Sequence, residues 1–432
     1  MLKYTHIISL LFISICTLFL GAATPNTVIA TINGFNFPEK VAITPNGQYV
    51  YVTNFGGNSV IVINHATNTI IATINGFNEP IGIAITPNGQ YAYVANGGNG
   101  TVGVIRTSDN SLLSTPDLNS GFSSPLAIAI TPDGQYAYVV SNANNTVRVI
   151  DIATNTLLIT PGLNGVFDGP FDIAITPNGS YAYVVNSGNN TVSVIDMAAN
   201  TASVPVGLSS GFNGPVAIAI TPNGAFAYVT NGSGTSVSVI DIGANTIIPT
   251  PGLNSGFLNP LDVAITPNGK YAYVGSYTDA SVVVIDVASN SIIPTPGLTG
   301  AFDGPQGIAI TPDDVYGYVT NITGDSVDVI FIGSPVGAPT NVQIRKIKNR
   351  FLTQTDLINY ITWQAPVTGI NAPVSYQLYR DAGLTQLIAT VLASGPLQYY
   401  DHNRQPNTPS PYYIVSVDQF GNTSQVASLV VV

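Results

Sequence analysis

Few side chains of this sequence are suited to acid–base or nucleophilic chemistry. The 432 residues include one cysteine and three histidines, and charged residues make up only 8% of the chain. Cys16 and His6 lie near the N-terminus, whereas His65 and His402 are far apart along the chain. Paired-histidine metal sites, cysteine sites and Ser–His–Asp relays need several such groups in one place. The composition therefore argues against these kinds of catalysis and leaves aspartate, lysine and aromatic side chains as candidates.

These candidates can be placed only through a repeat that fills most of the chain. The stretch AITPNGQYAYV, residues 84–94, returns with small changes. Its threonine recurs at Thr44, Thr86, Thr131, Thr176, Thr221, Thr266 and Thr311, with one spacing of 42 residues and five of 45. Seven copies at this period indicate one supersecondary unit used seven times.

Each copy is typical of four short β-strands. The runs IGIAITP and YAYVAN flank a Thr-Pro-Asn/Asp-Gly turn, in which proline suits the second position and glycine a left-handed one. A third run such as TVSVID and a fourth such as NTIIPTPGL follow. Four strands in about 45 residues is the period of a propeller blade, so the sequence predicts an all-β, seven-bladed β-propeller.

The two ends of the repeat region predict how the ring closes. The last copy stops after its third strand, SVDVIFIG, whereas residues 26–38 nearly repeat the fourth strand of residues 68–80. The N-terminal segment is therefore expected to supply the outer strand of the last blade. Closure of this kind removes two exposed sheet edges.

Ligand binding is expected where the copies differ. Strand direction places the loops that enter each first strand, and those between second and third strands, on the face opposite the uniform Thr-Pro turns. One position in each copy is expected to lie at the mouth of the central channel. Its residues in the seven copies are Lys40, Gly82, Ala127, Asp172, Ala217, Asp262 and Gly307. With the second-to-third loops, the predicted ligand site comprises Lys40, Phe55, Asp172, Asp262, Tyr277, Asp279 and Asp325.

Carboxylates, one lysine and aromatic edges suit a sugar, a peptide or a weakly bound calcium ion. No other cofactor or metal is predicted. Ordinary surface variation is the simpler interpretation of these residues, and a ligand site is the more specific one. Aspartate chemistry through Asp172 and Asp262 is the remaining catalytic possibility. These two residues belong to copies two blades apart, which disfavours it.

Two other recurring residue types have structural explanations. Asp151, Asp196, Asp241 and Asp286 each end a third strand, where a short acidic side chain can accept backbone hydrogen bonds in the following turn. The tyrosines of the YAYV runs recur at fixed strand positions, which favours packing between blades over a stacking platform.

The N-terminus is typical of a secretory signal. Lys3 precedes the apolar run IISLLFISICTLFLG and small residues up to Ala23, which predicts cleavage there and a protein that is secreted, periplasmic or displayed at the cell surface. A membrane anchor is the competing interpretation, but the run is shorter than the roughly 20 residues that a span needs. No transmembrane segment is expected after cleavage.

The charge distribution excludes one class of partner. Residues 24–334 carry four basic and 18 acidic side chains, a net charge of −14. Nucleic-acid binding depends on neutralising phosphates with lysine and arginine, so this class is excluded. The expected partner is a protein or a carbohydrate outside the cytoplasm.

Two stretches resemble known families. The words YVYVTN (49–54), AYVTN (227–231) and TVSVID (191–196) resemble the YVTN-type β-propeller repeats of secreted and surface-layer proteins. Beyond a Gly/Pro-rich linker at 333–339, Trp363 followed by QAP and the run YYIVSVDQFGNTS (412–424) resemble a fibronectin type III domain. That resemblance implies a β-sandwich of seven short strands, with Trp363 in its core and Tyr412 or Tyr413 as the corner tyrosine.

The predicted organisation is a signal peptide (1–23), a propeller (24–334) and a fibronectin type III-like domain (335–432). The predicted function is non-catalytic recognition through the variable propeller face. YVTN-type propellers also include lactonase-like enzymes, so a hydrolase is one alternative. A structural surface-layer or matrix component is the other.

Overall fold

The protein is described here by a computed structural model. It describes residues 25–333, 339–351, 354–366, 373–381, 384–402, 410–417, 423–424 and 427–431. The predicted signal peptide, residues 1–23, lies outside the described residues. None of the helices in the described part is long and apolar enough to cross a membrane.

Seven four-stranded antiparallel sheets form the repeat region, which confirms the predicted propeller. The first strands are β2 (Pro38–Ile43), β6 (Pro80–Ile85), β10 (Pro125–Ile130), β14 (Pro170–Ile175), β18 (Pro215–Ile220), β22 (Pro260–Ile265) and β26 (Pro305–Ile310). They contact one another in a closed ring, from β2 through to β26 and back to β2. Each copy of the repeat is therefore one blade, and blades 1 to 7 are numbered here by these first strands.

The middle strands of the blades are almost completely buried because they lie between neighbouring sheets. The second strands are β3 (Tyr49–Asn54), β7 (Tyr91–Asn96), β11 (Tyr136–Ser141), β15 (Tyr181–Asn186), β19 (Phe226–Asn231), β23 (Tyr271–Ser276) and β27 (Tyr316–Asn321). The third strands are β4 (Ser59–Asn64), β8 (Thr101–Arg106), β12 (Thr146–Asp151), β16 (Thr191–Asp196), β20 (Val237–Asp241), β24 (Ser281–Asp286) and β28 (Ser326–Phe331).

The outer strands differ from the prediction in five blades. They are long in β5 (Thr69–Asn75) and β1 (Thr27–Asn33), but short in β9 (Ser111–Leu112), β13 (Thr156–Leu157), β17 (Thr201–Ser203), β21 (Thr246–Ile248) and β25 (Ser291–Ile293). Each short strand is followed by a 3-10 turn: η1 (Pro116–Leu118), η2 (Pro161–Leu163), η3 (Val206–Leu208), η4 (Pro251–Leu253) and η5 (Pro296–Leu298). The leucine of each turn is fully buried. Proline cannot donate to a sheet ladder, so these strands end early, and the turn accounts for the longer spacing of these copies.

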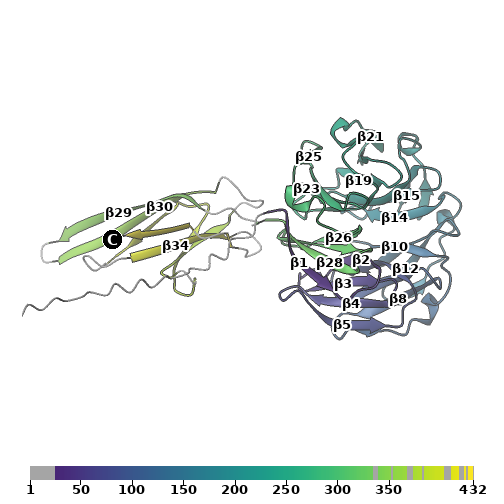
Figure 1. Ribbon diagram of the computed structural model, residues 1–432, viewed down its shortest axis with the longest axis horizontal. Helices are drawn as coiled ribbons and strands as arrows, with labels where there is room; N and C mark the ends of the chain where they lie inside the picture. The colour runs from purple at the N-terminus through teal and green to yellow at the C-terminus, as the bar shows by residue number, and fades with distance from the viewer. Residues whose placement is uncertain are drawn as a thin grey trace, which may run out of the picture.

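The N-terminal segment closes the ring as predicted. β1 pairs antiparallel with β28, so that the last blade has the order β1-β28-β27-β26. Figure 1 shows β1, near the start of the described chain, beside β28 from the end of the propeller. The seventh sheet therefore joins the two ends of the repeat region through backbone hydrogen bonds.

The Thr-Pro turns are hairpin turns, as predicted. In blade 1 the Thr44 hydroxyl donates to Oδ1 of Asn46 (2.7 Å) and accepts the N–H of Tyr49 (3.0 Å). Gly47 has φ = +71°, a left-handed conformation that glycine adopts without steric cost. The aspartates that end third strands also behave as predicted, since Oδ1 of Asp151 accepts the N–H of Thr154 at 3.0 Å.

A ring of tyrosine–asparagine hydrogen bonds links every blade to the next. The tyrosine at the third position of each second strand donates to Oδ1 of an asparagine in the outer turn of the following blade, over 2.5 to 2.8 Å. The pairs are Tyr51–Asn110, Tyr93–Asn155, Tyr138–Asn200, Tyr183–Asn245, Tyr228–Asn290, Tyr273–Asn26 and Tyr318–Asn68. All seven asparagines have a positive φ, between +49° and +57°. Asparagine is suited to both tasks because it tolerates left-handed backbone and offers an acceptor.

The Asn200→Ala variant is expected to lower the free energy of unfolding by about 2 kcal/mol. It removes the hydrogen bond to Tyr138 and places a Cβ without a compensating polar group at φ = +49°. Asn200→Gly should cost about half as much, because glycine keeps the left-handed backbone and loses only the hydrogen bond. Urea unfolding followed by circular dichroism measures both losses. Equal losses would contradict the conformational part of the explanation.

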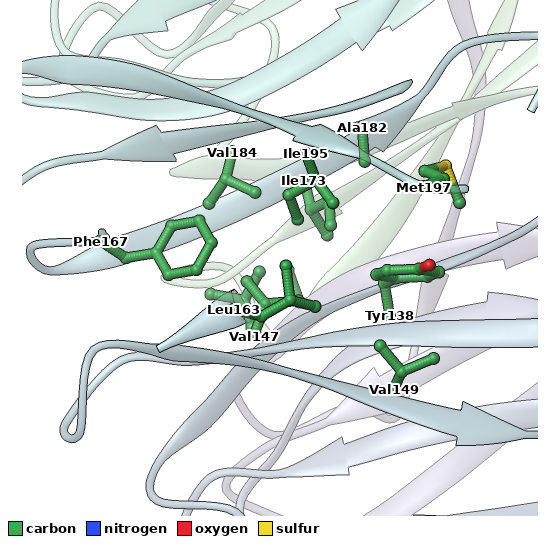
Figure 2. Close-up of a cluster of buried hydrophobic side chains, with 12 residues drawn as sticks. Tyr138, Val147, Val149, Leu163, Phe167, Ile173, Ala182, Val184, Ile195 and Met197 are labelled. Atoms are coloured by element: carbon green, nitrogen blue, oxygen red, sulfur yellow. The ribbon is translucent and has the colours of Figure 1, made fainter. Parts of the chain in front are cut away.

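The hydrophobic core lies between successive blades, since each sheet has a neighbour on both faces. Figure 2 shows the cluster between blades 3 and 4, in which Val147 and Leu163 of blade 3 face Phe167 and Val184 of blade 4. Equivalent clusters occupy the other interfaces of the ring. Because all seven interfaces use the same positions, variation is restricted to the loops and the channel.

The tail forms two sheets, as expected for a β-sandwich. One has the order β29-β30-β33 and the other β32-β31-β34-β35. Their bounds are β29 (Thr340–Phe351), β30 (Gln354–Gln364), β31 (Ser375–Tyr379), β32 (Leu387–Leu392), β33 (Gln398–Asp401), β34 (Ser410–Val417) and β35 (Ala427–Val431). Trp363 and Tyr412 are buried in the core, where the Tyr412 hydroxyl bonds to Asn359 (2.9 Å) and to Asp401.

Candidate functional site

A β-bulge at the start of every first strand sets the orientation of the channel residue that follows it. In blade 4, Pro170 pairs with Asn186 and Asp172 with Val185, which leaves Phe171 as the extra residue of the bulge. The same shift follows the first proline in each of the other six first strands. Bulges bend a strand and redirect its side chains, and they often lie beside functional sites. Each blade therefore presents one bulge residue and one channel residue at this end.

Lys40 and Asp262 form an ion pair across the channel end of blade 7. The Lys40 Nζ lies 2.8 Å from Oδ1 of Asp262, and their side chains are 25% and 11% exposed. Gly307 is the channel residue of the intervening blade. Its missing side chain lets the first strands of blades 7 and 1 lie close together, because a Cβ there would collide with the backbone carbonyl oxygen of Glu39.

The two aspartates also tie their blades to the next ones. Asp172 accepts the N–H of Ile173 at 2.9 Å and, with its other oxygen, the N–H of Ile218 in blade 5 at 3.0 Å. Oδ2 of Asp262 accepts the N–H of Ile308 in blade 7 at 2.8 Å. Glycine and alanine at the equivalent positions of other blades cannot make these bonds.

The electrostatics couple Asp172 to the same cluster. Burial raises the pKa of Asp172 to about 6, with Lys40 opposing the shift and Asp262 adding to it. Burial lowers the pKa of Lys40, but the fields of Asp262 and Asp172 outweigh it and hold this pKa above its ordinary value. Lys40, Asp172 and Asp262 are thus one electrostatic unit, although they come from blades 1, 4 and 6.

Two residues of this cluster were missed by the sequence-based prediction. Nε2 of Gln306 donates to Oε2 of Glu39 at 2.9 Å, and burial raises the pKa of Glu39, opposed by this bond and by Lys40. Both are bulge residues, in blades 7 and 1. A signal was present in the sequence, because the other five bulge residues are apolar: Ile81, Leu126, Phe171, Val216 and Leu261.

The bulge residues at the channel entrance therefore form a polar sector in blades 7 and 1 and an apolar sector in blades 2 to 6, the latter beside the channel residue Asp172. Glu39, Lys40 and Gln306 lie in the adjacent blades 7 and 1, beside Asp262 of blade 6. The five apolar bulge residues continue round blades 2 to 6, and Phe171 is 38% exposed. We call this ring of channel and bulge residues the channel girdle.

The other four predicted site residues lie in the second-to-third loops and contact neighbouring loops. Oδ1 of Asp325 accepts the N–H of Phe37 at 2.8 Å, and the N–H of Phe55 donates to the Phe37 carbonyl at 3.0 Å. The Tyr277 hydroxyl lies 3.3 Å from Oγ1 of Thr323. The structure brings these residues to the predicted face, but their hydrogen bonds do not connect them to Lys40.

Asp279 lies in the same turn as Tyr277. Burial raises the pKa of Asp279, and the Ser281 hydroxyl donates to the Asp279 backbone carbonyl at 2.9 Å. Among the described residues, no group of three or more histidine, cysteine, aspartate and glutamate side chains could hold a metal ion. The calcium possibility remains a prediction.

His65 lies away from this site, in the outer turn of blade 1. Its Nδ1 is 2.7 Å from the Tyr318 hydroxyl, and its ring meets that of Tyr316 edge-on at 5.1 Å. The Tyr318 hydroxyl donates its single proton to Oδ1 of Asn68. In the contact between His65 and Tyr318, the Nδ1–H of His65 is therefore the donor and the Tyr318 oxygen the acceptor. His65 therefore joins blade 1 to blade 7 and takes no part in the channel girdle.

The junction at His65 is expected to weaken in mild acid. Burial lowers the pKa of His65, with Asp313 opposing, so the unfolded chain binds a proton at a higher pH than the folded one. The free energy of unfolding should therefore fall as the pH drops below about 6.5, the ordinary histidine value. The His65→Met variant, with the residue that blade 4 has at this position, should lose this decline. Urea unfolding at pH 7.5 and 5.5 compares the two, and identical pH profiles would contradict the prediction.

Comparison with known proteins supports the fold. The family model described as "Lactonase, 7-bladed beta-propeller" matches residues 64–166 and 167–292, about half of the chain. A similar solved structure is a chain of Kuenenia stuttgartiensis hydrazine synthase, 22% identical, with a TM-score of 0.57 over 72% of this chain and 98% of that one. At this identity the similarity concerns the fold alone. No curated protein matches the chain.

Proposed function

Because the chain belongs to the family of seven-bladed lactonase β-propellers, we propose that its channel girdle is a binding site for a small, uncharged, polyhydroxylated ligand such as a saccharide. In this proposal the protein is a recognition protein outside the cytoplasm. The observation that carries the proposal is the division of the girdle into a polar and an apolar sector.

The polar sector offers hydrogen-bond donors and acceptors side by side. The Lys40 ammonium has three donors, of which the contact with Asp262 uses one. The Gln306 amide and the Glu39 carboxylate each have a second oxygen or nitrogen beyond their mutual bond. A sugar presents hydroxyl groups at its edge and C–H groups on its faces, so it suits hydrogen bonding at blades 7 and 1 and apolar contact near Phe171.

The charge of the propeller limits the ligand. Residues 24–334 carry a net charge of −14, and Lys40 is already paired with a carboxylate. An anionic sugar would be repelled and would find no free cluster of cations. An uncharged saccharide avoids both costs.

Hydrolysis of an uncharged lactone is the second candidate, which the family match and Asp172 favour. With a pKa of about 6, Asp172 would be largely ionised at neutral pH and suited to accept a proton from an attacking water. The Lys40 ammonium would then stabilise the negative charge on the carbonyl oxygen. Two backbone N–H bonds already engage Asp172, so this candidate is placed second.

Two further expectations belong to this proposal. The apolar N-terminal segment supports secretion or surface display, and the two tail sheets support a fibronectin type III-like spacer. The YVTN-type words support kinship with surface propellers. A structural surface-layer role predicts concentration-dependent assembly, which light scattering would detect.

Titration calorimetry with a panel of uncharged mono- and oligosaccharides tests the proposal. Glu39→Gln and Lys40→Met should each weaken binding at least tenfold, whereas Glu79→Gln, the matched change in the blade 2 loop, should leave the affinity unchanged. Saturable binding that tolerates both girdle changes would contradict the site. Absence of binding throughout, together with Asp172-dependent hydrolysis of δ-gluconolactone, would favour the enzyme instead.

A further inference from the structure

We infer that a second binding site, for an organic ammonium ion, lies between blades 3 and 4 on the face opposite the channel girdle. This site is independent of the proposed function. It is a partly open cavity of about 780 Å³. Its lining residues include Asp133, Tyr136, Ser180, Tyr181, Asp196 and Met197.

The cavity exists because small residues stand on its blade 4 side. Ser180 follows the Thr-Pro turn of blade 4, where blades 1, 2 and 3 have Gln48, Gln90 and Gln135. Met197 is 9% exposed and packs into the core cluster, and Figure 2 shows it at the same end of that cluster as Tyr138. The side chains that could fill the groove are thus short or turned inward.

The walls combine aromatic rings with carboxylates. Tyr136 and Tyr181 come from equivalent positions of the two blades, and Tyr181 is 44% exposed. Asp196 is paired across the strands with Tyr181. Among the residues that the structure describes, no lysine, arginine or histidine lines the cavity.

Both carboxylates are held in place by local bonds to one oxygen. Oδ1 of Asp133 accepts the Thr131 hydroxyl at 2.5 Å and the Gln135 N–H at 3.0 Å, and the pKa of Asp133 is lowered by these bonds, that of the hydroxyl first. Oδ1 of Asp196 accepts the Ala199 N–H at 3.0 Å. The local bonds fix the orientation of two negative charges beside the tyrosine rings.

Rings and carboxylates together select a weakly hydrated cation. The face of a tyrosine ring attracts an ammonium group, and the attraction is strongest when the ammonium group has lost its hydration water. Alkylated ammonium ions lose this water more readily than inorganic cations do. An uncharged apolar molecule would gain nothing from Asp133 and Asp196. A metal ion would find only two carboxylates, each already bonded through one oxygen.

The repeat contains an internal precedent for a nitrogen base in this groove. At the junction of blades 7 and 1, His65 stands at the position of Met197, and its ring contacts Tyr316 and Tyr318, which correspond to Tyr136 and Tyr138. The chain thus fills one groove with its own imidazole, whose pKa is lowered by burial, so the precedent concerns the size and shape of the groove. Between blades 3 and 4 Met197 is turned into the core instead, and the groove outside it stays open.

The test is titration calorimetry of the full chain with choline chloride, at constant ionic strength set with NaCl. Saturable binding is expected, and its affinity should fall at least tenfold in Tyr181→Ala and in Asp196→Asn. The matched control is Tyr91→Ala, the same position in blade 2, where Arg106 stands across the strands in place of Asp196. This control should bind choline like the unchanged protein. Circular dichroism melts establish that each variant is folded.

A neutral isostere of choline distinguishes recognition of the positive charge from binding that only fills the cavity with apolar groups. The alcohol 3,3-dimethylbutan-1-ol has the shape of choline without its charge, and it should bind at least tenfold more weakly. Equal binding of the two would overturn the proposal, as would the absence of saturable choline binding. An equal loss in Tyr91→Ala would also overturn it, because it would indicate non-specific attraction to an acidic surface.

Discussion

The Asp314→Gly variant is expected to be more stable than the unchanged protein by about 2 kcal/mol at pH 7. Asp314 occupies the turn position that is glycine in the other six blades, and it has φ = +65°. A side chain in this left-handed region costs about 1 kcal/mol. Its carboxyl group is fully buried, and burial raises its pKa to about 6, so that ionisation at neutral pH adds a further cost.

The pH dependence distinguishes these two contributions. Because the pKa of Asp314 is higher in the folded than in the unfolded protein, the folded state is penalised progressively as the pH rises from about 4 through 6. The gain from Asp314→Gly should therefore be larger at pH 7 than at pH 4. Asp314→Asn should recover mainly the part that depends on pH, since asparagine tolerates the same backbone without a charge.

Urea unfolding of the variants at pH 4 and pH 7 measures these differences. The control is Asp313→Asn, because the neighbouring aspartate stands where most other turns have asparagine. It accepts the Thr311 hydroxyl at 2.5 Å, a bond that asparagine can also make. This control should change stability by less than about 0.5 kcal/mol at pH 4, with a small gain at pH 7 because the charge of Asp313 also raises the pKa of Asp314. A loss of stability in Asp314→Gly would show that the bond from the Asn268 N–H to this carboxylate outweighs its costs.

Lys40→Met is expected to lower the free energy of unfolding by about 3 kcal/mol at pH 7. The change leaves Asp262, which is 8% exposed, with its bond from the Ile308 N–H but without its cationic partner. It also removes the cation that counters the raised pKa of Asp172. Removing one member of a buried pair is costly because the other charge then lies in a poorly solvated site.

The double variant Lys40→Met/Asp262→Asn provides the thermodynamic cycle. It should recover most of the loss, because neither charge remains and asparagine can still accept the Ile308 N–H. Lys270→Met, which changes an exposed lysine whose charge counters the raised pKa of Asp314, should cost no more than about 1 kcal/mol. Chemical denaturation of five proteins decides the matter: the unchanged protein, Lys40→Met, Asp262→Asn, the double variant and the Lys270→Met control. Additive losses in the cycle would mean that Lys40 and Asp262 are not coupled.

The sequence by itself determined the blades and their closure. The hairpin turn depends on contacts between residues at most five positions apart, such as the hydrogen bond from the Tyr49 N–H to the Thr44 hydroxyl. Such local contacts recur wherever the same sequence motif recurs. The seven Thr-Pro turns therefore predicted seven blades, and the near-repeat of residues 68–80 at residues 26–38 predicted the pairing of β1 with β28. Outer strands were overestimated in blades 2 to 6, where proline ends the strand and the buried leucine of a 3-10 turn follows.

Only the tertiary structure decided which polar residues act together. Asp172 and Asp262 stand in corresponding positions, but each reaches the N–H of a residue 46 positions along the chain, in the next blade. Glu39 and Gln306, which bond to each other across 267 residues, were passed over because the bulge had not been foreseen. Lys40 and Asp262, which form an ion pair, are 222 positions apart in the chain and belong to blades 1 and 6. Such contacts depend on how neighbouring blades face each other and on the bulges that turn the side chains, and a repeat pattern specifies neither.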